Sequence, residues 1–178
     1  MTPVFNGRFT AETDQPFVVF LIGMRINRWW RPDRWAPVAL AMGPMLRRLF
    51  ADSSQGLLHV ETWWNLRGPV LVQYWRSFEA LEAFARDPAE PHLGAWRRFN
   101  QAVGADGSVG IWHETYLIDP DRYECVYGNM PRFGLAAATT HVAAVGRHRT
   151  ARSRLGGASA VPAVYGATAA AQGGSAPD

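Results

Sequence analysis

The sequence contains no lysine and a single cysteine, Cys125. One cysteine excludes an intramolecular disulfide framework and a cysteine-based zinc site. The apolar run FVVFLIGM has about eight residues, too few to span a bilayer. It follows the acidic residues Glu12 and Asp14, so it does not form a signal peptide either. We therefore expect a cytoplasmic protein without a membrane partner.

Several catalytic and cofactor-binding motifs are also missing. The sequence has no HExxH pair, no glycine-rich phosphate loop, no GxGxxG fingerprint and no serine nucleophile elbow. These absences argue against a zinc peptidase, a nucleotide-binding enzyme and a serine hydrolase. We expect no bound metal and no dinucleotide cofactor.

Positive charge is concentrated near the C-terminus, although the formal net charge of the whole chain is only +3. Arg147, Arg149, Arg152 and Arg154 lie among small residues, without the interleaved aromatics that single-strand nucleic-acid binders use. We interpret this segment as a solvated tail and predict no nucleic-acid partner.

Tryptophan, by contrast, is abundant: all eight residues lie within the first 112 positions. A tryptophan brings a large flat surface and an N–H group that needs an acceptor when it is buried. Such a cluster indicates a flat-walled cavity, an extensive interface or plain core packing, and composition alone does not choose among them.

Hydrophobic periodicity and turn residues predict a series of strands and helices. In chain order these are a strand over 16–27, a helix over 33–52 bent at Gly43–Pro44, strands over 56–65 and 69–77, a helix capped by Ser77 and ending near 87–88, a helix from Pro91 to about 103, and a strand over 109–118.

This βαββαβ order predicts an α+β, ferredoxin-like unit with helices on one face of an antiparallel sheet. A second copy would cover the bare face, giving a homodimer of the dimeric α/β-barrel type. We predict a flexible lead over 1–15, this domain over 16–136 and an Ala/Gly/Ser-rich, largely disordered tail over 137–178.

The helix that begins at Pro91 carries His92, Trp96, Phe99 and Val103 on one face. Because a helix N-terminus disfavours a positive charge, His92 is expected to be neutral there. A neutral imidazole beside aromatic rings could act as a base, an acid or a ligand, or it could be an ordinary core histidine.

Other candidates lie on the predicted strands. In WHET, His113 and Glu114 must point to opposite faces, so one enters the helix-covered cavity and the other the dimer interface. His59 and Glu61 share one face. Arg25 and Asn27 also share a face, at the end of the first long strand, where they could reach a polar ligand group or simply face solvent.

Four stretches resemble a known family: FLIGMRINRWWRPDRWAPV, VLVQYWRSFEALEAFARDP, HLGAWRRFN, and VGIWHETY followed by YGNMPRFGLA. They are similar to a family that includes a monooxygenase of the fungal fumagillin pathway. That family belongs with antibiotic-biosynthesis and haem-degrading monooxygenases and, more distantly, haem-containing aldoxime dehydratases. The resemblance covers about residues 8–136.

The resemblance also implies site residues. Trp75 and Ser77 match a Trp–Ser pair that closes the third strand in many members, and His92 matches a histidine after the following helix. Asn27, Phe84 and His92 stand near the residues that line the site in haem-degrading members. Phe84 lacks the indole N–H found there, a departure that argues against haem degradation.

We therefore predict a small monooxygenase, an oxidoreductase that acts on a hydrophobic aromatic, polyketide or terpenoid substrate without flavin or nicotinamide. The alternatives are a haem enzyme of the dehydratase or haem-oxygenase type, with His92 or His113 as axial ligand, and a non-catalytic small-molecule-binding dimer. The predicted catalytic residues are His92, Asn27 and Arg25, and the predicted substrate-binding residues are Trp75, Phe84, Trp96, His113 and Glu114.

Overall fold

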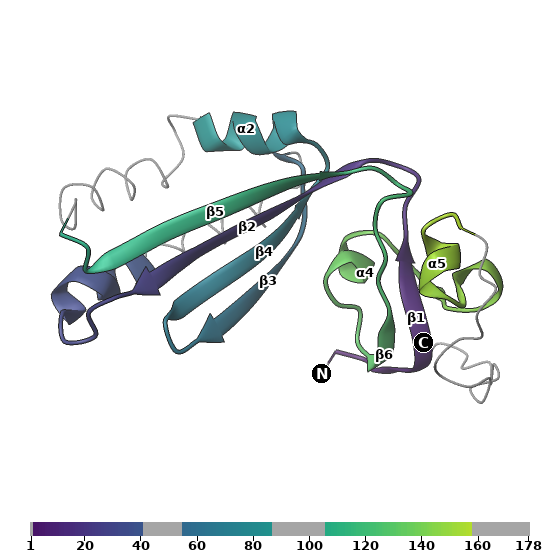
Figure 1. The fold of residues 1–178 in the computed structure, drawn as a ribbon, viewed down its shortest axis with the longest axis horizontal. Coiled ribbons are helices and arrows are strands. Elements are labelled where there is room, and N and C mark those ends of the chain that lie inside the picture. The colour runs from purple at the N-terminus through teal and green to yellow at the C-terminus, as the bar shows by residue number, and fades with distance from the viewer. Residues whose placement is uncertain (1, 41–54, 87–105, 158–178) are drawn as a thin grey trace. The chain divides into compact units, whose positions relative to one another are not determined.

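The computed structural model describes residues 2–40, 55–86 and 106–157. The chain forms two compact units (Figure 1). Unit 1 combines Met1–Asp14 with Pro120–Asp178, and unit 2 is Gln15–Asp119. Among the described helices, none combines the length and the hydropathy needed to cross a bilayer.

Unit 2 contains one four-stranded sheet. Its strands are β2 (Phe17–Ile26), β3 (Leu57–Asn65), β4 (Gly68–Trp75) and β5 (Val109–Ile118). They lie in the order β3-β4-β2-β5, and every neighbouring pair is antiparallel. A helix over 32–40 follows β2, and α2 (Phe78–Arg86) follows β4. This is the predicted α+β, ferredoxin-like arrangement, which is confirmed.

Local signals explain these elements. The continuous apolar run of β2 suits a central strand, and all ten of its residues pair with β5. Ser77 caps α2, since its Oγ accepts the backbone N–H of Ala80 at 3.2 Å. Glu79 adds a negative charge in the first turn, where the helix dipole favours one.

One face of the sheet is covered by helices, and we call it the helix face. At one end of this face, Val18 and Trp75 pack against Leu81 of α2. At the other end, Met24, Ile26 and Val109 form a buried cluster with Trp35, Val38 and Ala39 of the helix over 32–40. Figure 1 shows α2 lying along the sheet. The even-numbered residues of β2 therefore face the helices.

The opposite face, which we call the open face, follows from the strand register. It carries His59, Glu61 and Trp63 of β3, Val70, Val72 and Tyr74 of β4, Val19, Leu21, Gly23 and Arg25 of β2, and Gly110, Trp112, Glu114 and Tyr116 of β5. Its two central strands are mostly apolar, and its edge strands bring aromatic and charged side chains. The Trp112 indole lies over Gly23, where an added Cβ would come within 2.9 Å of the ring.

Unit 1 is built on a second antiparallel sheet, of order β6-β1-β7. Its elements are β1 (Phe5–Glu12), β6 (Tyr127–Met130), α4 (Leu135–Ala138), β7 (Thr140–Ala143), the 3-10 turn η2 (Gly146–His148) and α5 (Ala151–Arg154). The structure thus corrects two expectations. The predicted flexible lead contains a strand paired on both sides, and the described part of the predicted disordered tail, 137–157, contains a strand and two helical turns.

An aromatic cluster gives unit 1 its own packing. The His141 ring stacks on Phe9 with centroids 4.5 Å apart and meets the edge of Phe5 at 4.8 Å. Its Nε2 is buried without a hydrogen-bond partner among the described residues. Burial and the nearby Arg132 lower the pKa of His141, so the ring is held in its neutral form.

Candidate functional site

The helix face brings together two residues predicted to bind substrate, Trp75 and Phe84. Trp75 is completely buried, and its ring centroid lies 5.5 Å from that of Phe84 on α2. The Trp75 Nε1–H donates to Oε1 of Gln73 at 2.9 Å. This bond satisfies the indole and fixes the orientation of a buried amide.

Gln73 was missed by the sequence analysis. It is only 2% exposed, although it is a polar residue in the middle of β4. The register of β4 places the Gln73 side chain on the helix face, beside that of Trp75. The sequence does hold a signal for it: Gln73 alternates with Leu71 and Trp75 along β4, so it shares their buried face although it is polar.

His113 lies on the same face as Trp75. Of His113 and Glu114, it is therefore the one that faces the helices. Its ring is 5.6 Å from that of Phe20, and Phe20 pairs with Gln73 across β2 and β4. Gln73 on β4 and His113 on β5 therefore flank the central strand at Phe20 and Ile22. This aromatic and aliphatic surface carries two polar groups that could hold an oxygen atom of a flat hydrophobic ligand.

Arg25 and Asn27 do lie together, but on the other side of the sheet. Arg25 Nε donates to Asn27 Oδ1 at 3.1 Å, and Asn27 Nδ2 donates to the Gly107 carbonyl at 3.1 Å. Arg25 is exposed between the buried Met24 and Ile26. Arg25 and Asn27 thus share a face, as predicted, but strand alternation puts Arg25 on the open face and Trp75 on the helix face.

Glu114 also lies on the open face, where it accepts a 2.6 Å hydrogen bond from the Tyr116 hydroxyl. This bond and the charge of Glu114 raise the pKa of Tyr116. His59 and Glu61 share this face as predicted, with 2.8 Å between Nε2 and Oε1. These two pairs lie on the edge strands β5 and β3 and make both edges of the open face polar. Glu114 therefore lies on the opposite side of the sheet from Trp75 and His113.

The remaining predicted residues, His92 and Trp96, lie outside the described residues. Within the described ranges, no group of three or more His, Cys, Asp or Glu side chains could hold a metal ion. The described part of the helix face thus supplies an aromatic wall, a buried amide side chain and one imidazole.

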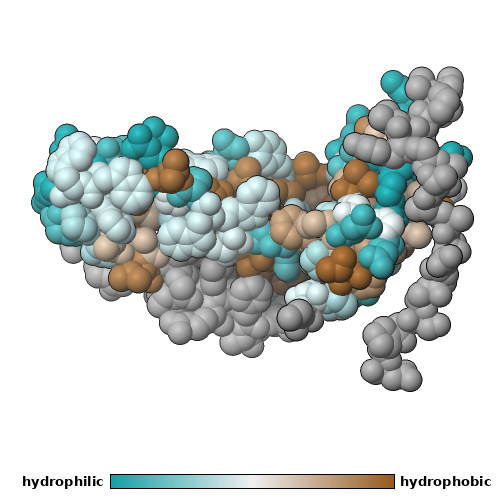
Figure 2. Space-filling view, turned by 90° about the horizontal axis from the view of Figure 1, so that it is seen from below, coloured by the Kyte–Doolittle hydropathy of each residue, from teal (hydrophilic) through white to brown (hydrophobic). Residues whose placement is uncertain are grey.

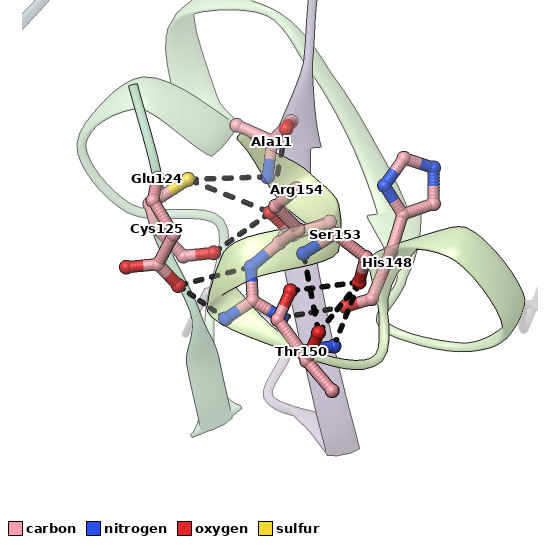
Figure 3. A network of polar contacts seen from close by, with 8 residues as sticks. Ala11, Glu124, Cys125, His148, Thr150, Ser153 and Arg154 are labelled. Atoms are coloured by element: carbon pink, nitrogen blue, oxygen red, sulfur yellow. Dashed lines mark hydrogen bonds and ion pairs between the residues drawn. The ribbon is translucent and has the colours of Figure 1, made fainter. Parts of the chain in front are cut away.

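Unit 1 contains a polar pocket that the sequence analysis did not predict (Figure 3). Arg154 of α5 bonds the Glu124 carboxylate and the His148 carbonyl. Cys125 lies beside them, with its Sγ 3.4 Å from the Ala11 backbone nitrogen. The Arg154 side chain is only 6% exposed. Each nitrogen of the Arg154 guanidinium donates to a protein oxygen, so the network holds α5 against Glu124, in the segment that precedes β6.

Comparison with known proteins identifies the family of the chain. A family model described as monooxygenase af470-like matches residues 17–135, more than half of the sequence. The chain belongs to the monooxygenase af470-like family. The match covers nearly all of unit 2 and extends to the end of the resemblance noted in the sequence. It includes β2, Trp75, α2 and β5.

One curated relative is similar to part of the chain. The chain is 33% identical over 79 residues to monooxygenase af470 of Aspergillus fumigatus, an alignment that covers 42% of this chain and 27% of that protein. The chain thus spans about a quarter of its curated relative.

Two solved structures are similar to part of the chain. Rv0793 from Mycobacterium tuberculosis has 17% identity and a TM-score of 0.42, over 57% of this chain and 93% of the other. A dimeric protein of ferredoxin-like fold from Bacteroides fragilis has 12% identity and a TM-score of 0.40, over 56% and 96%.

Proposed function

We propose that the chain is a small monooxygenase that oxidises a hydrophobic aromatic, polyketide or terpenoid substrate on the helix face of unit 2, without flavin or nicotinamide. Membership of the monooxygenase af470-like family supports the reaction class. The observation that carries the choice of site is the buried Trp75–Gln73 pair beside Phe84, a polar group held in an aromatic wall.

The proposed reaction needs an activated carbon on the substrate. A base removes a proton from a methylene next to an aromatic ring or a carbonyl, and the resulting carbanion reacts with O₂. The methylene becomes a carbonyl, one oxygen atom enters the product and the other leaves as water. The substrate supplies all the electrons, so no external reductant is required.

Each residue has a defined part in this proposal. Trp75 and Phe84 exclude water and support the flat substrate. The Nε2 hydrogens of Gln73 stabilise the oxygen on which the carbanion charge is delocalised, as in an oxyanion hole. His92, which lies outside the described residues, is the proposed base. His113 is the imidazole that the structure describes on the helix face.

Oxygen uptake with anthrone tests this function, since its methylene lies between two rings and its product, anthraquinone, is readily measured. We expect uptake without added cofactor and a loss of about a hundredfold or more in His92→Ala. The Glu82→Gln variant, at a half-buried position of α2 that pairs with Arg86, is the control for folding and should keep the rate. Uptake that persists in His92→Ala would reject this base.

The same preparation distinguishes the alternatives. A Soret band in the purified protein, with uptake that follows haem content, would support the haem enzyme in place of the cofactor-free one. Saturable quenching of tryptophan fluorescence by anthrone, without oxygen uptake, would support the non-catalytic binding dimer.

We further propose that a second copy of the chain covers the open face. Leu21, Val70 and Val72 of the two central strands are only half-buried on this face, and sheet-on-sheet packing would remove them from water. Light scattering should then give twice the 19.8 kDa chain mass. Leu21→Arg should give the single-chain mass, because it places an unpaired charge at the centre of the interface. A parent protein that scatters as a single chain would contradict the dimer.

A further inference from the structure

One end of unit 2 collects residues from three separate parts of the sequence. The Ile26 N–H donates to the Arg67 carbonyl at 2.7 Å, and Arg67 Nη1 donates to the Ile26 carbonyl at 3.2 Å. The N–H groups of Asn27 and Arg28 both donate to the Ser108 carbonyl. These bonds tie the end of β2, the β3–β4 turn and the start of β5 into one surface.

Large apolar side chains project from this end into solvent. Trp30 is 75% exposed, Trp64 is 72% exposed and Leu66, at the tip of the β3–β4 turn, is 89% exposed. The neighbouring Trp29 is anchored differently: its carbonyl accepts the Trp35 indole N–H at 3.2 Å, and the two rings meet edge to face. Trp30 is therefore the more exposed ring of this loop, since Trp29 is 46% exposed.

Positive charge surrounds these side chains. The two aspartates of this end already have partners, since Asp33 pairs with Arg31 at 2.8 Å and Asp106 lies 3.8 Å from Arg34. Two further arginines, Arg28 and Arg67, are exposed. Hydrogen bonds from Ser108 and, more weakly, the charge of Arg28 lower the pKa of Asp106. Arg67 is held by the Ile26 carbonyl. In Figure 2, hydrophilic residues in teal gather at this end of unit 2, on the left of the view.

We propose that this surface, formed by Trp30, Trp64, Leu66, Arg28 and Arg67, docks on an anionic phospholipid bilayer. Tryptophan rings prefer the headgroup level of a bilayer, and the aliphatic tip can enter the acyl boundary. The exposed guanidiniums of Arg28 and Arg67 match the negative surface of lipids such as phosphatidylserine. The docking needs no spanning segment, so it revises the expectation of no membrane partner, which rested on the lack of one.

The aliphatic component favours a bilayer over a nucleic acid. A single-stranded nucleic acid is bound by aromatic platforms along a positively charged groove. Here Leu66, the most exposed large apolar side chain of the surface, has no stacking role. It projects beyond the sheet with the two tryptophans, an arrangement that suits insertion.

Flotation with vesicles of phosphatidylcholine containing about one-third phosphatidylserine tests the proposal. The full chain should float with these vesicles at about 0.05 M salt, and much less with pure phosphatidylcholine or at about 0.5 M salt. The double variant Trp30→Ser/Trp64→Ser and the single variant Arg28→Gln should each weaken partitioning, the double variant by roughly tenfold or more.

Two matched variants serve as controls away from this surface. Leu117→Ser removes a side chain that is 70% exposed at the other end of β5, and Arg86→Gln removes a guanidinium that is 78% exposed on α2. Both should partition like the parent. Equal losses in the controls and the surface variants, or no flotation of the parent, would overturn the proposal.

Two further measurements keep the result independent of variant folding. Lipids brominated high on the acyl chain should quench the tryptophan fluorescence of the unmodified chain, and an absence of quenching would count against insertion. Tight binding to an oligothymidine that depends on Arg28, without any vesicle binding, would assign the surface to nucleic acid and reject the bilayer.

Discussion

Replacing Trp75 with alanine is expected to lower the free energy of unfolding of unit 2 by about 3–5 kcal/mol. The ring is fully buried between Val18, Leu81 and Phe84, so its removal leaves a cavity under α2. Urea unfolding followed by tryptophan fluorescence measures the loss, and it reports unit 2 alone because every tryptophan of the chain lies between residues 15 and 119.

A second substitution separates the ring from its hydrogen bond. Trp75→Phe keeps most of the packing but leaves Gln73 Oε1 buried without its donor, a loss of about 1–3 kcal/mol. Adding Gln73→Leu should recover part of that loss, because both polar partners are then removed. No recovery in the double variant would mean that the indole N–H contributes little.

The control for Trp75 is Trp64→Ala, on the neighbouring strand. That side chain is 72% exposed, so its removal should change the free energy of unfolding by about 0.5 kcal/mol or less. If the two alanine variants lose similar stability, Trp75 is not the centre of the helix-side core.

The second large effect is expected in unit 1, from Arg154→Ala. This change leaves Glu124, whose side chain is 29% exposed, without its partner and frees the His148 carbonyl. Breaking a buried pair from one side costs about 3–5 kcal/mol, and we expect about 2–3 kcal/mol here because Glu124 is partly solvated. Hydrogen exchange at β1 measures it, as amides such as that of Ala11 should lose roughly tenfold protection for each 1.4 kcal/mol.

Arg147→Ala is a close control, because Arg147 lies in the same segment and also pairs with a carboxylate, Glu12. Its side chain is 73% exposed, so the change should lower stability by about 1 kcal/mol or less. Equal loss of β1 protection in both variants would show that the contacts of Arg154 with Glu124 and His148 stabilise unit 1 no more than a surface ion pair does. Neither variant should shift the tryptophan fluorescence transition, which reports unit 2.

The elements of unit 2 were predictable because their signals are local. The uninterrupted apolar run that became β2, the Ser77 cap of α2 and the alternating residues of β5 each define an element without reference to the rest of the chain. The βαββαβ order then leaves few topologies, and the observed strand order is the expected one.

Unit 1 was not predictable in this way, because its sheet joins the two ends of the chain. In β1, Phe9 pairs with Tyr127 and with Ala143, more than a hundred positions away. Its partners β6 and β7 have four residues each, too few to show a period. Arg154 was read as part of a solvated tail for the same reason, since its partner Glu124 lies far from it in sequence.

The candidate site was predictable in part. The burial of Trp75 and the opposite orientations of His113 and Glu114 follow from the strand period. The face of Arg25 did not follow, because the apolar residues before it hide which positions of β2 face the helices. Only the sequence Met24–Arg25–Ile26, with one exposed residue between two buried ones, marks the alternation.

The alternation within β2, β4 and β5 has an evolutionary consequence. On each strand, neighbouring positions face opposite sides of the sheet. Under the proposed function, a change at Gln73 or His113 alters substrate binding, whereas a change at Val72 or Glu114 alters packing of the second copy. Family members that share an assembly but differ in substrate should vary at every second position of these strands. Members that share a substrate but differ in assembly should vary at the positions between.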